Sequence, residues 1–350
     1  MQKYNSFVTE ICGVKMKKGN LESRNGMWRE YQGDEISWSQ MLLTFPNKGY
    51  LNDVSWGRHL NNMGWSCLRW EFIRNETPSA YCQGFLKKYP FGVGVLWIPD
   101  GIIGDYKHIS FLHHDLYNIL NLRFLYIRFR ESQVFNVDDY IKILAGGWSK
   151  PKIPLGSSLT MMLDISGSLD DIRARFTQNW RRTLKKSTNE AFQIVEVKDH
   201  RVIADLYLEL KKSKALSAKQ IYSDTVIESV MQSFEDNLVV LGAMDTEGNI
   251  VAIRGAICHN GQAADMFAAM NPLGRSMSAS HAVLVALLEA CKQRQCTTYD
   301  LSGIDPANSL GVYNFKKGTG AEAKASVGEF EWSNNWWLQV AFNRLVKYRE

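Results

Sequence analysis

The sequence is poor in the residues that build metal centres and disulfide frameworks. Six cysteines and seven histidines are scattered over 350 residues, without a Cys-x-x-Cys pair or an HxH or HxxxH spacing. Zinc sites and disulfide-rich proteins show regular spacings because their ligands or sulfurs must meet in space. We therefore expect reduced thiols, no protein-bound metal and no permanently bound cofactor.

Long apolar runs are also lacking. The longest, residues 281–291 with Glu289 inside it, is about half of the roughly 20 residues that a bilayer-spanning helix needs. The first 20 residues scatter Lys and Glu among short apolar pairs, so they lack the continuous apolar region of a secretory signal. We expect a cytoplasmic protein without stable membrane insertion, and its oligomeric state is left open.

Positive charge is concentrated in one segment. The formal net charge of the chain is only +5, whereas residues 171–220 hold twelve Lys/Arg and six Asp/Glu, a net charge of +6. Clustered Lys and Arg neutralise phosphates without regard to sequence. The segment therefore predicts a surface for a polyanion such as tRNA, with a set of solvated helix faces as the alternative interpretation.

The length and a break in the middle predict two domains. A chain of 350 residues exceeds what one hydrophobic core usually holds. Residues 146–158, GGWSKPKIPLGSS, contain three glycines and two prolines, which interrupt regular structure. We place an N-terminal domain at 1–150 and a C-terminal domain at 151–332. A helix at 333–350, with Trp336 and Trp337 in its apolar stripe, is expected to pack on the body.

The periodicity of apolar residues predicts helices and strands in both halves. In the first half we expect a helix after Asp53, strands at 67–73, 92–98 and 124–129, and helical or turn-rich stretches at 80–88 and 115–121. The second half reads as strand 159–165, a basic helix capped by Ser168, helices 204–214 and 224–234, strands 238–244, 250–258 and 263–269, helix 281–293 and strand 298–301. That order is expected of a GNAT-type acyltransferase domain, and the predicted fold class is α/β (α+β).

The segment 297–332, TTYDLSGIDPANSLGVYNFKKGTGAEAKASVGEFEW, carries the most specific signal. It holds Tyr-Asp-Leu-Ser-Gly-Ile at 299–304, Phe-Lys at 315–316 before a glycine-containing turn, and Gly-Glu at 328–329. These motifs resemble the C-terminal signature of the FemABX aminoacyltransferase family, and Trp-Gly at 56–57 and Gly-Trp at 64–65 agree more weakly. The resemblance implies two GNAT-like domains, each a mixed sheet flanked by helices.

The resemblance also implies an activity. Members of this family use aminoacyl-tRNA to extend a peptide on a UDP-linked peptidoglycan precursor or a lipid-linked equivalent. The substrate amine attacks an ester carbonyl, and a fixed cation near its oxygen stabilises the charge that develops there. Lys316 matches the lysine of the family's Phe-Lys pair and is the candidate for this role, with Phe315 packed beneath the turn to aim it. The alternative interpretation is that Lys316 and Lys317 are a solvated basic pair without a catalytic role.

Other candidate site residues follow from their positions. Asp300 ends a predicted strand beside Gly303, a location where α/β proteins often place functional groups, although its carboxylate could equally cap a loop. Gly303 is expected to permit a close backbone approach or a positive φ. The remaining substrate-binding candidates are Trp56, Arg58, Arg130, Lys214, Lys219, Asp265 and Phe267, of which Arg58, Lys214 and Lys219 are matched to the phosphates of the precursor.

The sequence departs from the family at three places. The run at 128–130 is Arg-Phe-Arg, and Glu131 lies one place later than the acidic residue that follows Arg-Phe in the family. The strand at 264–269 lacks tyrosine hydroxyls, and no heptad run forms the helical tRNA arm of some members. These gaps indicate a divergent member whose acceptor is another cell-envelope intermediate, such as a nucleotide-linked amino sugar.

Two other functions remain open. An acyl-CoA-dependent GNAT N-acyltransferase of surface polysaccharide biosynthesis would bind pyrophosphate at the start of a helix. Residues 274–280, GRSMSAS, keep small side chains there but lack the glycines of the usual Q/RxxGxG/A loop. A non-catalytic nucleic-acid-binding module would use residues 171–220, but it would not need the Phe-Lys pair at 315–316.

Overall fold

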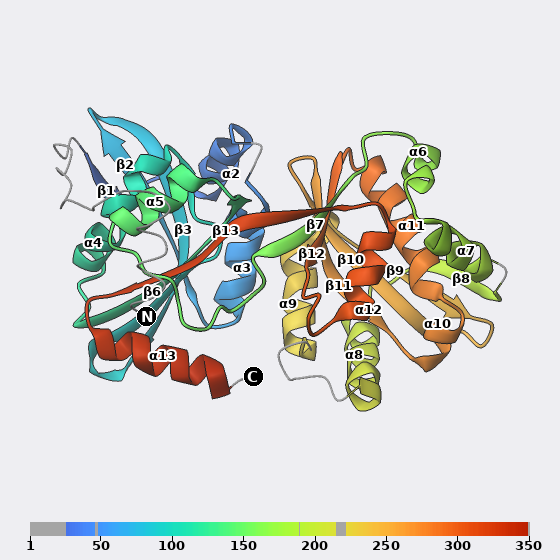
Figure 1. The fold of residues 1–350 in the computed structure, drawn as a ribbon. Coiled ribbons are helices and arrows are strands. Elements are labelled where there is room, and N and C mark those ends of the chain that lie inside the picture. Colours follow the sequence, from blue (N-terminus) through green and yellow to red (C-terminus); the bar gives the residue numbers. More distant parts are fainter. Residues whose placement is uncertain (1–25, 46–47, 189, 215–221, 349–350) are drawn as a thin grey trace.

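The computed structural model describes residues 26–45, 48–188, 190–214 and 222–348. Figure 1 shows two lobes side by side, each with strands in a layer and helices packed against them. The strands are β1 (Met27–Glu30), β2 (Ser66–Arg74), β3 (Thr77–Tyr89), β4 (Val93–Ile98), β5 (Ile102–Gly104), β6 (Phe124–Val134), β7 (Leu159–Asp164), β8 (Phe192–Glu196), β9 (Leu238–Asp245), β10 (Ile250–His259), β11 (Gln262–Met270), β12 (Thr298–Gly303) and β13 (Glu322–Ser333).

The helices alternate with these strands along the chain. They are α2 (Glu35–Leu43), α3 (Val54–Asn62), α4 (Ile109–Leu120), α5 (Val137–Ala145), α6 (Leu169–Ala174), α7 (Gln178–Ser187), α8 (His200–Lys214), α9 (Asp224–Phe234), α10 (Pro272–Ser276), α11 (Ala279–Gln293), α12 (Leu310–Gly318) and α13 (Trp336–Tyr348). No helix within the described residues is both long and apolar enough to cross a bilayer.

The last strand joins the two lobes into one sheet. In the described part of the chain the strand order is β1-β2-β3-β4-β6-β13-β7-β12-β11-β10-β9-β8, with β5 paired to β3. Residues 322–325 of β13 pair with β7, and residues 326–333 pair with β6 of the first lobe. Figure 1 shows β13 crossing between the lobes. The mixed α/β fold class is confirmed, and the chain returns to the first lobe before residue 332.

The two parallel strands in the middle of the second lobe separate after a short pairing. β11 and β12 pair only over 262–264 and 298–300. In the neighbouring antiparallel pair, Gly255 faces Phe267 while Ala256 faces Asp265, so Met266 is an extra residue in β11. Such bulges re-aim side chains and are frequent beside active sites. The bulge turns Asp265 toward the region where β11 and β12 part.

The lobes share an apolar core at their junction. Trp56 and Leu60 of α3 belong to the same buried cluster as Ile227 and Val230 of α9 and Phe267 of β11. Burial of such side chains contributes about 1.5–3 kcal/mol each. The relative position of the lobes is therefore stabilised by packing, and it does not depend on β13 alone.

The stretch at 80–88 was expected to be helical or turn-rich, and that prediction was wrong. It is part of β3, which pairs with β2 on one side and with β4 and β5 on the other. The turn before it, Asn75 and Glu76, has positive φ at both residues. Glycine is usual at the second position of that turn. Because Glu76 stands there instead, the hairpin could not be recognised from the sequence.

The basic helix expected after Ser168 is two helices. Ser168 caps the start of α6 as the sequence predicted, and Asp171 completes a capping box with it. Thr177 then caps α7 through its side chain, and its backbone N–H donates to Gly318 O at 2.8 Å. The break is therefore imposed by a contact with the end of α12, which lies far away in the sequence.

Candidate functional site

Lys316 lies in the last turn of α12, with its ammonium turned toward the end of β12. The residue is buried, with 7% of its surface exposed. Its Nζ donates to the carbonyl oxygens of Ser302 at 3.2 Å and Gly303 at 2.8 Å. The third N–H has no partner among the described residues. Burial lowers the pKa of Lys316, and Asp265 and Asp300 oppose this shift without cancelling it.

Aromatic side chains hold the end of α12 in place. The Phe315 ring lies 5.0 Å from His281 and 5.8 Å from Trp180, measured between ring centroids. The indole N–H of Trp180 donates to the carbonyl of Phe315 at 3.2 Å. A side chain at Gly318 would come within 2.5 Å of Trp180, so glycine is required for this approach. Phe315 lies in the helix and not beneath a turn, and it packs beside Lys316.

Arg254, Asp265 and Tyr299 form a buried polar group beside Lys316. Arg254 Nη2 lies 2.5 Å from Asp265 Oδ2, and the Tyr299 hydroxyl donates to Asp265 Oδ1 at 2.8 Å. The Arg254 guanidinium also lies over the Phe315 ring, 5.2 Å from its centroid. Buried polar groups need such partners, so these contacts hold the Asp265 side chain in a fixed position next to Lys316.

Asp300 binds the loop that holds Lys316. Its carboxylate accepts from the Thr160 hydroxyl of β7 and, at 2.8 Å, from the Ser302 N–H. Burial raises the pKa of Asp300, against these hydrogen bonds and Lys316. The positive φ expected at Gly303 belongs to Ser302, with φ 65°. The close approach does fall on Gly303, where a Cβ would lie 3.3 Å from Ser157.

Two aromatic candidates are part of the core. Trp56 is 8% exposed and Phe267 is fully buried, both in the cluster that joins the lobes. The Trp56 ring packs against Tyr50 at 5.5 Å between centroids. In this structure neither ring offers a free face to a substrate, and both support the junction.

The basic candidates are dispersed. Arg58 on α3 forms an ion pair with Glu35 at 2.7 Å. Arg130 on β6 is half-buried, and its Nη2 lies 3.4 Å from Ser157 O. Lys214 ends α8, but its side chain and the whole of Lys219 lie outside the described residues. The structure thus brings together Lys316, Phe315, Asp265, Asp300 and Gly303, and leaves Arg58 away from them.

Tyr50 is a site residue that the sequence did not reveal. Burial raises the pKa of its hydroxyl; Tyr222 and Asp300 raise it further, and Arg130 opposes them. The hydroxyl therefore lies near groups from both lobes. Tyr50 is in a short 3₁₀ helix, η1 (Tyr50–Asn52), and nothing in its local sequence marks it. Arg130 and Asp300 are thus charged neighbours of the same hydroxyl.

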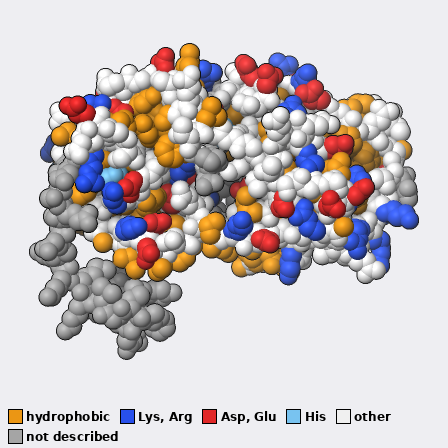
Figure 2. Space-filling model, turned by 90° about the horizontal axis from the view of Figure 1, so that it is seen from above, with side chains coloured by type: hydrophobic (Ala, Val, Ile, Leu, Met, Phe, Trp, Pro, Cys, Tyr) orange, Lys and Arg blue, Asp and Glu red, His pale blue; other side chains and the backbone are white. Residues whose placement is uncertain are grey.

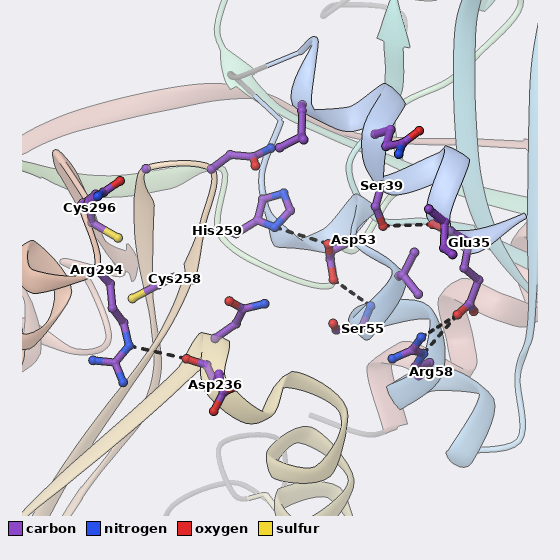
Figure 3. A pocket seen from close by; sticks show the side chains of 18 of the residues that line it. Glu35, Ser39, Asp53, Ser55, Arg58, Asp236, Cys258, His259, Arg294 and Cys296 are labelled. Atoms are coloured by element: carbon purple, nitrogen blue, oxygen red, sulfur yellow. Dashed lines mark hydrogen bonds and ion pairs between the residues drawn. The ribbon is translucent and has the colours of Figure 1, made fainter.

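A cavity of about 790 Å³ opens at the junction of the lobes. Figure 3 shows α2, α3 and the β10–β11 turn around it, with His259 pointing toward Asp53. His259 Nδ1 lies 3.4 Å from Asp53 Oδ2, while Nε2 has no partner among the described residues. Burial lowers the pKa of His259 despite Asp53. Gly261, in the turn before β11, is one of the lining residues, and it precedes Asp265 by four residues, about 13 Å of extended chain.

A second buried lysine lies in the first lobe. Lys48 Nζ donates to Asp100 O at 3.0 Å and lies 3.4 Å from Glu131 Oε1. Tyr106 donates to the other oxygen of Glu131 at 2.7 Å. Burial by itself lowers the pKa of Lys48, but Glu131 and Asp100 outweigh it and the pKa is raised. Glu131, which lies one position later than the acidic residue of the FemABX motif, belongs to this closed cluster.

Comparisons with known proteins agree on the fold. No curated protein matches the chain. Residues 172–317 match a family model described as an acetyltransferase (GNAT) domain. A crystal structure of FemX is 14% identical, covers 90% of this chain and 100% of its own, and superposes with a TM-score of 0.76. The matched region of the GNAT model includes Arg254, Asp265 and Lys316.

Two further solved structures extend the comparison. A tandem GNAT protein from the clavulanic acid biosynthesis pathway, solved without AcCoA, is 12% identical over 89% of this chain and 99% of its own, with a TM-score of 0.54. L-PGS from Bacillus licheniformis is 13% identical over 82% and 91%, with a TM-score of 0.51. The expected resemblance to FemABX proteins is confirmed as a likeness of fold: the chain has a two-lobed fold similar to that of FemX, and residues 172–317 of the second lobe match the GNAT model.

Proposed function

We propose that this protein transfers an aminoacyl group from aminoacyl-tRNA to an amine of a nucleotide-linked cell-envelope precursor. The observation that carries the proposal is the ammonium of Lys316, held by two carbonyls with one N–H left over. It lies where β11 and β12 part. A cation held in advance stabilises developing negative charge without reorganising during the reaction.

In the proposed reaction the acceptor amine forms an amide with the aminoacyl group, next to Lys316. The acceptor amine attacks the ester carbonyl of the donor, and the carbonyl oxygen becomes an oxyanion. This oxyanion accepts a hydrogen bond from the remaining N–H of Lys316. Collapse of the tetrahedral intermediate breaks the ester C–O bond, and the ribose hydroxyl of the tRNA leaves with the proton that the amine gave up. Asp300 acts as a positioning residue, because it holds the Ser302 N–H while the Ser302 carbonyl holds Lys316.

The loop before α11 weighs against acyl-CoA as donor, although the first turn of α11 itself stays open. A CoA pyrophosphate would need free backbone N–H groups there. Instead Asn271 caps α10 by accepting from Gly274 N at 2.9 Å. The N–H groups of Arg275, Met277, Ser278 and His281 also donate within the loop, whereas the Ser278 side chain does not cap the first turn of α11. Acyl-CoA remains the second candidate donor because residues 172–317 match an acetyltransferase model.

The tRNA would contact α7. Its cations Arg181, Arg182, Lys185 and Lys186 are all exposed. Figure 2 shows cations and carboxylates interspersed on the visible face of the second lobe. We therefore assign the tRNA contact to α7, and not to the whole basic segment 171–220.

The anionic part of the acceptor would enter the cavity of Figure 3. Arg58 lines it, but this guanidinium is paired with Glu35. Arg294 also lines the cavity and contacts only backbone carbonyls, of Asp236 and Ala290, at 3.5 Å each. Arg294 is therefore the better candidate for a phosphate ligand, since its guanidinium has no carboxylate partner among the described residues.

A transfer assay read by mass spectrometry tests the proposal. Purified protein is offered mixed aminoacyl-tRNA or a panel of acyl-CoAs, against UDP-linked peptidoglycan precursor and UDP-amino sugars. Lys316→Met is compared with Lys317→Met, a matched variant because Lys317 is exposed on the same helix turn. We expect product from tRNA that Lys316→Met, unlike Lys317→Met, lowers by a factor of about 10²–10³. Product from acyl-CoA alone would establish the second candidate, and no product from either would favour a nucleic-acid-binding module.

A further inference from the structure

One edge of the first lobe exposes large aromatic side chains. Phe91 is 88% exposed, Trp336 is 75% exposed and Tyr89 is 48% exposed. Phe91 lies in a 3₁₀ turn, η2 (Pro90–Gly92), with φ 64°, a conformation that few residues other than glycine and asparagine adopt readily. Isolated exposed apolar residues are common, but a group of rings that gathers on one edge marks an interaction surface.

Three separate segments bring these rings together. Val93, just after η2, pairs with Phe124 at the start of β6. The Phe124 ring contacts Trp337 at 5.3 Å between centroids. The side chain of Asn334 donates to Arg123 O at 3.0 Å and accepts from Leu125 N at 2.8 Å. The turn η2, the start of β6 and the start of α13 therefore form one edge, which we call the aromatic edge.

The start of α13 brings two tryptophans to this edge. Its inner side buries Leu338 and Val346, and Phe342 stacks on Tyr126 at 4.3 Å. Trp336 and Trp337 (39%) are exposed at its start. Leu345 (64%) is also exposed, but it lies nine residues from Trp336, about two and a half turns, and so on the opposite side of the helix. The apolar surface of the edge therefore comes from the first turn of α13 and not from a second face along the helix. Figure 1 shows α13 running along the border of the first lobe.

The charges around the aromatic edge have one sign. Residues 77–99, 116–130 and 332–347, which contain all of it, include no Asp or Glu. Their exposed cations are Lys88, Arg123, Arg344 and Lys347. Aromatic tips surrounded by Lys and Arg are the composition of surfaces that enter the headgroup region of a bilayer with anionic lipids.

We propose that the aromatic edge docks this protein on an anionic lipid surface, with Phe91 and Trp336 inserted among the headgroups and the four cations at the phosphates. A second copy of the chain fits less well. In a symmetric dimer the same patch meets itself, which would place cations against cations without a carboxylate between them. The docking goes beyond the proposed transfer reaction and does not depend on its donor or acceptor.

Co-sedimentation with lipid vesicles tests the docking and requires no substrate. The full chain is mixed with vesicles of phosphatidylcholine, or of phosphatidylcholine and phosphatidylglycerol. The test variant is Phe91→Asn with Trp336→Ser, since Asn accepts the φ of residue 91. The control is Val134→Ser with Val137→Ser: both valines are more than half exposed, and Val134 lies ten residues from Phe124, about 33 Å along β6.

We expect binding to the phosphatidylglycerol vesicles that weakens with added salt, because charge contributes to it. The test variant should bind at least about ten-fold more weakly, whereas the control should bind as the wild type does. Arg123→Glu with Lys347→Glu should give a similar loss. Equal binding of wild type and test variant, or no binding to either vesicle, would overturn the proposal. Light scattering that shows a wild-type dimer, a monomeric test variant and no vesicle binding would assign the edge to self-association.

Discussion

Among the described residues, each lobe buries one lysine beside acidic groups, and the two are held differently. In the first lobe Lys48 lies 3.4 Å from the carboxylate of Glu131, and its pKa is raised. In the second lobe Lys316 donates only to backbone carbonyls, and its pKa is lowered. One ammonium is neutralised by a direct ion pair, whereas the other keeps an N–H for a further partner.

This difference separates a structural lysine from a reactive one. A buried ion pair contributes little net stability, but it costs much free energy to break. The ion pair therefore fixes Lys48, just before η1, against Glu131 of β6. A cation held by carbonyls at the end of a strand has a different use, because its charge is not cancelled. The comparison predicts that loss of the Lys48 ion pair lowers the free energy of unfolding, whereas loss of Lys316 lowers the rate of transfer.

The largest expected effect is on the stability of the first lobe. Glu131→Gln removes the partner of a lysine that is only 3% exposed, and it should lower the free energy of unfolding by about 3–5 kcal/mol. Chemical denaturation measures this change. The double variant with Lys48→Met should recover most of the loss, because neither charge is then buried. Glu30→Gln, at an exposed position, is the control, and an equal cost in both single variants would contradict a locked pair.

Removal of the second lysine should affect catalysis more than folding. If the proposed transfer is correct, Lys316→Met lowers kcat by a factor of about 10²–10³, since one oxyanion donor is lost. Lys317→Met should keep near wild-type kcat. Thermal unfolding followed by circular dichroism checks that both variants are folded. A folded Lys316→Met with full activity would remove the lysine from the mechanism.

The pH dependence of the reaction sharpens the assignment. The lowered pKa of Lys316 means that its ammonium deprotonates at a lower pH than an ordinary lysine. Activity should therefore fall as pH rises through this lowered pKa. Arginine stays protonated throughout, so Lys316→Arg, at whatever rate it retains, should lose the decline at high pH. An unchanged decline in that variant would assign it to another group.

The smallest expected effect lies at the junction of the lobes. Asp53 accepts from Ser55 N at the start of α3 and also faces His259 of the second lobe. Asp53→Ala should cost about 1–2 kcal/mol of unfolding free energy, near the upper end for a helix cap. Asp34→Ala removes the exposed cap of α2 and should cost about 0.5–1 kcal/mol. Equal losses in urea denaturation would show that the contact with His259 adds nothing.

The sequence predicted the second lobe better than the first. Caps such as Ser168 and Asp53, and helix periodicity after residue 200, depend on neighbours within a few residues. β3 was missed because it is buried between β2 and its other partners, and only pairing makes it a strand. The break after Arg175 depends likewise on the contact of Thr177 with Gly318.

The candidate site was predicted in part for the same reason. Lys316, Phe315 and Asp300 belong to a motif that can be read along the chain, and they do lie together. Arg254, Tyr299 and Tyr50 were missed because their proximity to Asp265 and Asp300 depends on the bulge in β11 and on the packing of the lobes. Trp56 and Phe267 were expected at a substrate, yet their apolar rings are buried in the shared core.

The sequence by itself determined most of the helices and strands of the second lobe, helix caps such as Ser168 and Asp53, and the place of the Phe-Lys motif, because these depend on residues close together in the chain. Only the tertiary structure decided that β13 joins both lobes, that Glu131 closes on Lys48, and that Lys316 keeps one N–H free. Strand pairing, burial and the balance of charges around a buried group all arise from segments that meet only when the chain is folded.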